Sequence, residues 1–291
     1  MVNIIVANEY RLTNCIGKGS CGKIYEGNHL HTHTQVAVKI SNNSLRHEHE
    51  IYTKLQDLIG IPKCFQHGTE GKFDFLVIEL CGPSVNVLRT EHIFSLKTTL
   101  VIGIQLLKRL DDVHTRGVIH GDLKPSNILI GRHEENHKIY LMDFGLSQTI
   151  LPQTSENCVT VTEFIGTVQY ASIRAHKLAA PTRWHDLESF AYVLLYLHLG
   201  KLPWQDVHHD DPKVKQKMIC EMKESFNFWS LQVPGEFLVI INYCKQGKPD
   251  DMPSYVYLKT LLLNLYKLKG YEVDNVTEWS GQYQSQQLST L

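Results

Sequence analysis

The chain has 291 residues, a length that suits one two-lobed unit or two domains. Hydrophobic residues make up 43% and charged residues 20%, so we expect a globular fold and exclude disorder over most of the length. The formal net charge is −1, which gives no overall attraction to nucleic acid or to an anionic membrane. We therefore expect neither of these partners, and we expect a monomer.

Seven cysteines are scattered without a Cys-x-x-Cys pair, which indicates neither a disulfide framework nor a zinc knuckle. This usage fits a reducing compartment, so we expect an intracellular protein of the cytoplasm, the nucleus or both. No basic lead-in of a signal peptide opens the sequence. The most apolar stretch, residues 187–200, is too short to span a bilayer and predicts a buried helix.

The first eighty residues predict a small β-rich lobe. Short segments rich in β-branched and aromatic residues are separated by Gly, Asn and His-Thr turns. The expected strands are residues 10–17, 23–30, 35–40 and 74–80. Residues 44–58 predict a helix before the last of these strands, with Ser44 as N-cap. Its apolar face carries Ile51, Leu55 and Leu58.

From residue 83 onward the pattern becomes helical. Residues 95–114 repeat apolar side chains at helical spacing, and residues 128–145 return briefly to strand character. Further helices are expected at 186–199, 213–229, 235–245 and 254–268.

Gly82 and Pro83 interrupt both patterns, so we place the joint between two lobes at residues 79–83. The sequence thus predicts an α+β, bilobal domain over residues 9–270. Its N-lobe would span 9–80 and its larger helical C-lobe 84–270, followed by a loose polar tail at 271–291.

A glycine-rich stretch joins the first two expected strands. Gly17, Gly19 and Gly22 have the G-x-G-x-x-G spacing that lets backbone amides approach phosphate oxygens. A dinucleotide fingerprint and a kinase glycine-rich loop share this spacing, and Gly17 to Lys23 also fits the G-x-x-x-x-G-K of a Walker A loop. Ile24 stands where Walker A needs Ser or Thr, and a strand is predicted where the dinucleotide fingerprint and Walker A require a helix. The hairpin favours the kinase loop, although for the motif in isolation a turn without any ligand is the default.

Lys39 lies inside the otherwise apolar strand VAVKI. An internal lysine must reach solvent or pair with an anion, because an unpaired buried ammonium is costly. Glu48 and Glu50 of the following helix are the candidates, and Glu48 shares the face of Ile51 that turns toward the strands. We predict the Lys39–Glu48 pair, although two unrelated surface charges would explain these residues as well.

Three polar residues of different kinds follow the long helix and precede the apolar ILI. The carboxylate of Asp122 is able to accept a hydroxyl proton, and the ammonium of Lys124 to neutralise phosphate charge. The amide oxygen of Asn127 is able to ligate magnesium, and Asp143 in LMDFGLS supplies a second hard oxygen ligand. Folding requirements alone do not explain this ordered set.

In this order, the glycine loop, VAVK, HxDLKPxN and DFG resemble the eukaryotic protein kinases over residues 9 to about 270. DLKPSN resembles the serine/threonine branch. The segments GTVQYASI (166–173) and HDLESFAYVLLYLHLGKLPWQ (185–205) are similar to the casein kinase 1 family, and HGD resembles the vaccinia-related kinases. The resemblance implies a bilobal protein kinase fold and transfer of the ATP γ-phosphate to serine or threonine.

The resemblance also implies roles for individual residues. Asp122 would be the base, Lys124 the phosphate clamp, and the Lys39–Glu48 pair would hold the α- and β-phosphates. Magnesium would bind Asn127 and Asp143. The ATP site would comprise Ile16, Gly17, Lys18, Gly19, Ser20, Cys21, Gly22, Lys23, Ile24, Ala37, Lys39, Ile78 as gatekeeper, and the hinge residues Glu79, Leu80 and Cys81. Asp186 would anchor the catalytic loop.

Two departures from the family pattern affect regulation and specificity. Gly121 replaces the arginine that gathers a phosphorylated activation loop. Gln169 stands where the casein kinase 1 family has the arginine of GTARYAS, which leaves Lys215 and Lys217 to receive acidic or phosphorylated protein substrates.

A pseudokinase that acts as a nucleotide-binding scaffold is the alternative function. The intact Lys39, Asp122, Asn127 and Asp143 argue against it. A small-molecule phosphotransferase is disfavoured by GTVQYASI, which in protein kinases shapes a peptide platform.

Overall fold

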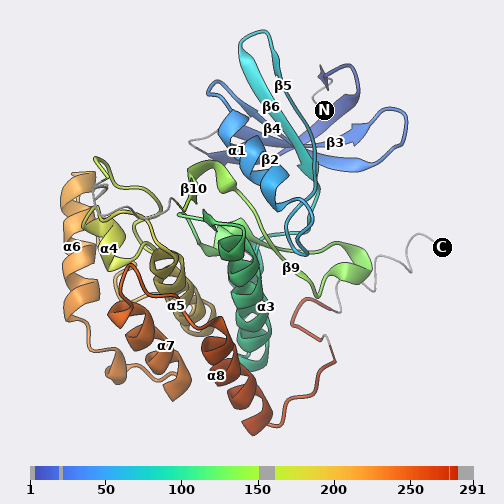
Figure 1. Cartoon of the computed structure of the whole chain (residues 1–291). Coiled ribbons are helices and arrows are strands. Elements are labelled where there is room, and N and C mark those ends of the chain that lie inside the picture. Colours follow the sequence, from blue (N-terminus) through green and yellow to red (C-terminus); the bar gives the residue numbers. More distant parts are fainter. Residues whose placement is uncertain (1–3, 20–21, 151–160, 275, 281–291) are drawn as a thin grey trace.

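The computed structural model describes residues 4–19, 22–150, 161–274 and 276–280. These residues form two lobes, a twisted β-sheet with one helix and a larger lobe of helices (Figure 1). The predicted α+β class with a β-rich N-lobe and a helical C-lobe is confirmed.

The sheet of the N-lobe is antiparallel and has, among the described residues, six strands in the order β1-β2-β3-β4-β6-β5. The strands are β1 Ile5–Val6, β2 Tyr10–Gly19, β3 Gly22–His29, β4 Gln35–Ser41, β5 Cys64–Glu70 and β6 Phe73–Glu79. The four predicted strands correspond to β2, β3, β4 and β6. The edge strand β5 was not predicted, because its sequence CFQHGTE is polar and no residue in it is fully buried.

Alternate residues of a strand face opposite sides of this sheet. In β4, Val36 and Val38 pack in a small core on the outer side. Ala37 lies in the main core on the inner side, together with Ile78 of β6. Lys39 follows Ala37 by two residues, so this alternation places its side chain toward the inner side.

The helix of the N-lobe, α1, spans Arg46–Leu55 and buries Glu48, Ile51 and Leu55. It is shorter than the predicted 44–58. Leu45 occupies the N-cap position without a capping side chain, and Ser44 Oγ accepts a hydrogen bond from the Arg46 amide at 3.3 Å. The expectation that Ser44 is the N-cap was therefore wrong by one residue.

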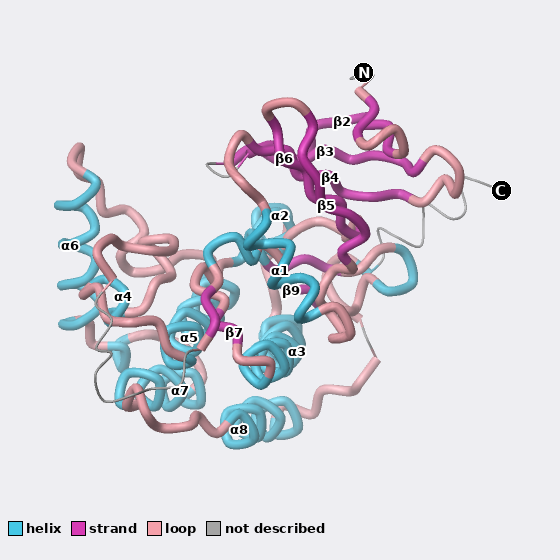
Figure 2. The backbone as a smooth tube through the Cα atoms, turned by 45° about the horizontal axis from the view of Figure 1, so that its top comes forward, coloured by secondary structure: helices cyan, strands magenta, loops and turns pink. Residues whose placement is uncertain are grey.

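The C-lobe is a stack of helices around α5. The helices are α2 Val85–Glu91, α3 Leu96–Thr115, α4 Ile173–His176, α5 Arg183–Leu199, α6 Pro212–Ser225, α7 Gly235–Gln246 and α8 Tyr255–Leu268. Helix α3 packs against α5 and α8, and α7 packs against α5 and α8, as the end-on view in Figure 2 shows. Helix α5 is buried around most of its circumference, which confirms the buried helix predicted from its apolar sequence. Among the described residues, no helix is long and apolar enough to cross a bilayer.

Two short antiparallel strand pairs hold the ends of the polar loops. Strand β7, Val118–Ile119, pairs with β10, Gln148–Thr149, and β8, Ile128–Ile130, pairs with β9, Ile139–Leu141. Short 3-10 turns follow the loops at Pro125–Asn127, His133–Glu135 and Phe144–Leu146. At the joint, the Gly82 amide donates to the Ile130 carbonyl at 2.9 Å, and a Cβ on Gly82 would lie 2.7 Å from the Gly131 oxygen. The joint therefore requires glycine at this position.

The structure corrects two further boundaries. The helix predicted at 213–229 ends at Ser225, because Asn227 caps a separate 3-10 turn, Phe228–Ser230. Phe226 and Phe228 pack on Trp204, so their apolar character belongs to the core of the lobe and does not continue the helix.

The expected loose tail is also wrong for its described part, residues 271–274 and 276–280. Trp279 is buried against Phe94, and its indole N–H donates to the Asn136 carbonyl at 3.2 Å. Trp279 is a single large aromatic residue in a polar segment, so no hydrophobic periodicity predicted that this segment packs on the domain. Residues 281–291 lie outside the described part of the chain.

Candidate active site

A cleft of about 640 Å³ lies between the lobes, within the range usual for small-molecule sites. Its walls come from β2, β3 and β4 above, from the joint behind, and from the β8 and β9 region below. Of the predicted nucleotide and metal residues, those that line it are Ile16, Gly17, Ile24, Ala37, Ile78, Glu79, Leu80, Cys81, Asn127 and Asp143.

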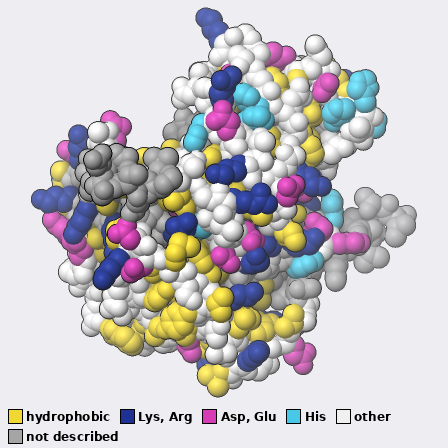
Figure 3. All heavy atoms as spheres, in the orientation of Figure 1, with side chains coloured by type: hydrophobic (Ala, Val, Ile, Leu, Met, Phe, Trp, Pro, Cys, Tyr) yellow, Lys and Arg dark blue, Asp and Glu magenta, His cyan; other side chains and the backbone are white. Residues whose placement is uncertain are grey.

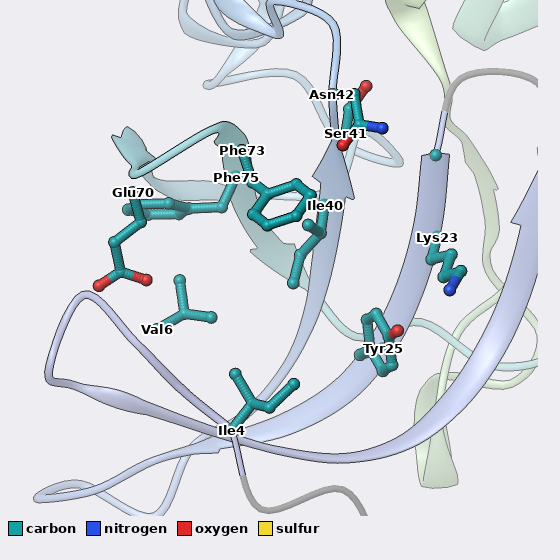
Figure 4. A pocket seen from close by; sticks show the side chains of 11 residues that line it. Ile4, Val6, Lys23, Tyr25, Ile40, Ser41, Asn42, Glu70, Phe73 and Phe75 are labelled. Atoms are coloured by element: carbon teal, nitrogen blue, oxygen red, sulfur yellow. The ribbon is translucent and has the colours of Figure 1, made fainter.

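The other predicted residues of the glycine-rich stretch lie elsewhere. Lys18 and Gly19 are exposed at the end of β2, and Ser20 and Cys21 are outside the described residues. Gly22 and Lys23 line a different cavity of about 390 Å³ on the outer face of the sheet, among apolar side chains such as Tyr25 and Phe75 (Figure 4). Strand alternation explains the split, because Ile24 faces the cleft while its neighbours in β3 face outward.

Lys39 connects the two lobes. Its ammonium donates to Glu48 Oε2 at 2.7 Å and to Asp143 Oδ1 at 2.9 Å. The side chains of Lys39 and Glu48 are buried, whereas Glu50, the other candidate, is exposed. Burial opposes the charge of Lys39, but the two carboxylates raise the pKa of this lysine above its ordinary value. The ammonium is therefore held in place for an anionic ligand in the cleft.

Asp122 is the centre of a second polar cluster. Its Oδ2 accepts from Lys124 Nζ at 2.6 Å, and its Oδ1 accepts from Thr167 Oγ1 at 2.7 Å. Lys124 Nζ also donates to Thr167 Oγ1 at 3.1 Å. The carboxylate is only 6% exposed, so a polar group that reaches it would be held close to both the lysine and the threonine.

Asn127 and Asp143 present oxygen atoms to the same cleft. The side-chain amide nitrogen of Asn127 donates to the Asp122 carbonyl at 2.9 Å, which leaves its amide oxygen for another partner. Asp143 has a left-handed backbone, with φ of 66°. Burial would raise the pKa of Asp143, but Lys39 lowers it below its ordinary value and keeps the carboxylate charged. Two hard oxygen donors on the cleft wall suit a divalent cation such as Mg²⁺.

Aromatic packing supports the backbone that carries Asp143. Phe144 is fully buried between the rings of Tyr52 and His120, at centroid distances of 5.1 and 5.2 Å. The Tyr52 hydroxyl accepts from the Asp143 amide at 3.2 Å. Because Tyr52 belongs to α1, the position of this helix is tied to the position of Asp143.

The loop that carries Asp122 is anchored from below by Asp186 of α5. The Asp186 carboxylate accepts from the amides of His120 and Gly121 at 2.7 and 2.9 Å. Burial alone would raise the pKa of Asp186, but the hydrogen bond with His114 and those with the loop lower it. The anchoring contact expected for Asp186 is thus present.

Gly121 has a backbone φ of 80°, in the left-handed region that glycine adopts without strain. A Cβ at this position would lie 2.9 Å from the Leu146 carbonyl oxygen. Any larger residue here would require the segment after Asp143 to shift slightly. The absence of an arginine at this position can be read from the sequence, whereas the left-handed backbone cannot.

Cys81 lies on the joint wall of the cleft, beside Leu80. Burial raises the pKa of the Cys81 thiol far above its ordinary value, and the charge of Glu79 adds to this effect. The thiol therefore stays protonated and is a poor nucleophile at neutral pH.

The residues expected to receive acidic substrates lie near α6. Lys217 is exposed and has Glu221 at 3.9 Å, whereas the Gln169 carbonyl accepts from the Trp204 indole at 2.8 Å. Figure 3 shows basic side chains over α6 interspersed with acidic ones. The cations there are partly compensated rather than concentrated in one strong patch.

Two residues of this region were not assigned a site role from the sequence. The role of Thr167 could not be predicted, because its contact with Asp122 joins residues 45 positions apart and no local pattern indicates it. Lys223 has a fully buried side chain that donates to the Val168 and Ala171 carbonyls. For Lys223, the signal available in the sequence was a lysine at a buried position of the helical pattern.

Comparison with known families identifies the domain. A family model described as the protein kinase domain matches residues 10–260. The matched range includes the cleft, both polar clusters and the Asp186 anchor.

Proposed function

Since this chain belongs to the protein kinase family, we propose that it is a Mg-ATP-dependent serine/threonine kinase of the casein kinase 1 type. The observation that carries the proposal is the pair of polar clusters in one cleft. Lys39 joins Glu48 to Asp143, and Asp122 lies within hydrogen-bond distance of Lys124 and Thr167. Phosphoryl transfer requires a group that accepts the hydroxyl proton and cations that face the phosphates, and these side chains are of those kinds.

Phosphoryl transfer depends on positioning and on electrostatic stabilisation. In the proposed reaction Asp122 orients the acceptor hydroxyl and receives its proton. Lys124, 2.6 Å from that carboxylate, stabilises negative charge on the transferred group. Lys39 holds the non-transferred phosphates of ATP from the opposite lobe.

Asn127 and Asp143 would hold Mg²⁺, because both line the cleft with a free oxygen. Held by these two residues, Mg²⁺ would supply positive charge that neutralises the phosphates of ATP. The contact of Asp143 with Lys39 places these ligands beside the lysine that receives the phosphates.

Thr167 supports the choice of serine and threonine as acceptors. It lies at the start of GTVQYASI, the segment that resembles the casein kinase 1 family, and it contacts both Asp122 and Lys124. Since Thr167 brings its own short hydroxyl to 2.7 Å from Asp122, the hydroxyl of a serine or threonine substrate would fit against the same carboxylate. We propose acidic or phosphorylated protein sites as substrates, with Lys215 and Lys217 as the available cations on α6.

Transfer from labelled ATP with magnesium to casein or to an acidic peptide tests the proposal. The Asp122→Asn variant should lower kcat by at least about a hundredfold, which is the scale of general-base contributions. Nucleotide binding and thermal stability should stay close to those of the wild type. Asp206→Asn, an exposed acid paired with Lys201, is the matched control and should keep full activity.

Absence of transfer by the wild type to any protein or peptide would overturn the proposal. If nucleotide still bound under those conditions, the pseudokinase function would replace it.

A further inference from the structure

Lys223 of α6 has a fully buried side chain whose ammonium contacts two backbone carbonyls and one histidine ring. It donates to the Val168 carbonyl at 2.8 Å, to the Ala171 carbonyl at 2.7 Å, and has His176 Nε2 at 3.1 Å. The same Nε2 lies 3.2 Å from the Val168 carbonyl, so Lys223, His176 and this carbonyl form one buried polar cluster. The two carbonyls accept more strongly from a charged lysine than from a neutral amine.

Aromatic rings complete the surroundings of this ammonium. Nζ lies 4.9 Å from the centroid of Tyr192 and 5.3 Å from that of Trp204. Both distances are within the range of favourable cation–π contacts. No carboxylate of the described residues lies within ion-pair distance of Lys223, so backbone carbonyls and rings compensate its charge.

The two carbonyls belong to the segment that begins at Thr167. The carbonyl of Gln169, which lies between Val168 and Ala171 in the chain, accepts a hydrogen bond from the Trp204 indole at 2.8 Å. Glu188 of α5 accepts from the Ile173 amide at 2.8 Å. Side chains from α5, from α6 and from the loop that joins them therefore fix the backbone of residues 168–173 from below.

We propose that Lys223 is a positioning residue for peptide substrate, because it fixes the backbone of residues 168–171 next to Thr167. This inference rests on the proposed kinase function. It assigns Lys223 no contact with the reacting atoms. Replacing Lys223 would loosen residues 168–171. The nucleotide cleft would stay unchanged, because other elements line it.

The ionisation of this lysine gives the inference a pH signature. Burial lowers the pKa of Lys223 to about 7, against smaller raising effects of Glu188 and Cys220. The other titratable groups facing it are His176 of α4 and Tyr192 of α5, and Lys245 of α7 donates to its carbonyl at 3.1 Å. Burial and the charge of Lys223 lower the pKa of His176 to about 3, so this imidazole is neutral.

The direction of the pH effect follows from these values. Below about pH 7 Lys223 is charged and its hydrogen bonds are charge-assisted. Above this pH it becomes neutral and the bonds weaken by roughly half. We expect the KM for peptide to rise as the pH increases through this range, while the KM for ATP stays flat.

The test compares Lys223→Met with Lys213→Met, an exposed lysine of the same helix. Lys223→Met should raise peptide KM by about tenfold, the scale of losing a charged hydrogen bond. It should change kcat and ATP affinity by less than about threefold and abolish the pH dependence of peptide KM. Lys213→Met should resemble the wild type in each measurement.

A second variant and a readout without catalysis keep the inference testable if Lys223→Met folds poorly. Trp204→Phe removes the indole donor to Gln169 and should also raise peptide KM selectively. Hydrogen–deuterium exchange of residues 167–173 should become faster in both variants. If exchange increases but the wild type transfers no phosphate, the proposed function fails while the positioning role stands.

Two outcomes would overturn the inference. One is unchanged peptide KM and unchanged exchange in a folded Lys223→Met protein. The other is an equal loss for peptide and ATP in both Lys223→Met and Trp204→Phe, since a general structural defect has that effect.

Discussion

Gly121 bears on whether the enzyme needs activation by phosphorylation. An arginine at this position would be the counter-charge for a phosphate in the activation segment, and glycine supplies none. The Lys39–Glu48 and Lys39–Asp143 contacts are formed, and Gly121 adopts a backbone that suits its lack of a side chain.

We therefore expect protein made in bacteria and treated with phosphatase to keep essentially all of its transferase activity. Activity measured before and after the treatment, with mass spectrometry of the activation segment, checks this. An obligatory phosphate on Thr162 or Thr167, or on Thr160 outside the described residues, would contradict it.

Thr167 should affect the chemical step directly. Thr167→Val removes its hydrogen bonds to Asp122 and Lys124, and a hydrogen bond to a charged group contributes about 1.5 to 3 kcal/mol. We expect kcat to fall by about tenfold or more, and Thr167→Ser to retain most of the activity. Thr162→Val, at an exposed position a few residues earlier, is the control for steady-state kinetics. Equal rates for the valine and wild-type proteins at residue 167 would show that the contact is dispensable.

At the scale of residues, the sequence predicted contacts that local periodicity determines. The pairing of Lys39 with Glu48 followed from the strand position of the lysine and the helical face of the glutamate. The contact between Thr167 and Asp122 could not be predicted in this way. It joins residues 45 positions apart and forms only when the activation segment folds back on the loop.

Helix α6 is the element on which substrate preference depends in our proposal. Gln169 brings no charge to an upstream phosphate, so Lys215 and Lys217 would provide it. We expect the preference for a phosphorylated over an unphosphorylated peptide to be at least about tenfold weaker than with arginine at 169, since charged hydrogen bonds are about twice as strong as neutral ones.

The ratio of kcat/KM for matched peptides measures this preference. Gln169→Arg should raise the ratio and Lys217→Ala should lower it, whereas Lys267→Ala on the exposed side of α8 should not. A wild-type ratio of several hundred, or no effect of the Lys217 change, would place the phosphate site elsewhere.

At the scale of elements, the helices with strong hydrophobic periodicity were the ones predicted well. Residues 95–114 and 186–199 were predicted within a few residues of α3 and α5, because both helices bury long apolar faces. Strand β5 and helix α2 were not predicted. Strand β5 is polar at the sheet edge, and α2 has only 7 residues, too few for a helical period to stand out.

The packing of Trp279 contributes to the stability of the whole molecule. Its ring is 1% exposed and lies 5.4 Å from the ring of Phe94. Trp279→Ala should lower the free energy of unfolding by about 3 to 5 kcal/mol, the usual loss for a buried aromatic residue. Val273→Ala, at a position 90% exposed, should change it by less than about 0.5 kcal/mol. Chemical denaturation of both variants tests this, and equal midpoints would show that the segment only rests on the surface.

The contacts of this segment also set an order of events during synthesis on the ribosome. The Ser95 amide donates to Glu278, which follows it by 183 positions. At about 5 to 20 residues per second, roughly 10 to 40 seconds separate the emergence of these two partners. Throughout that interval the start of α3 and the ring of Phe94 remain uncovered in the nascent chain, and a chaperone has this time in which to bind them.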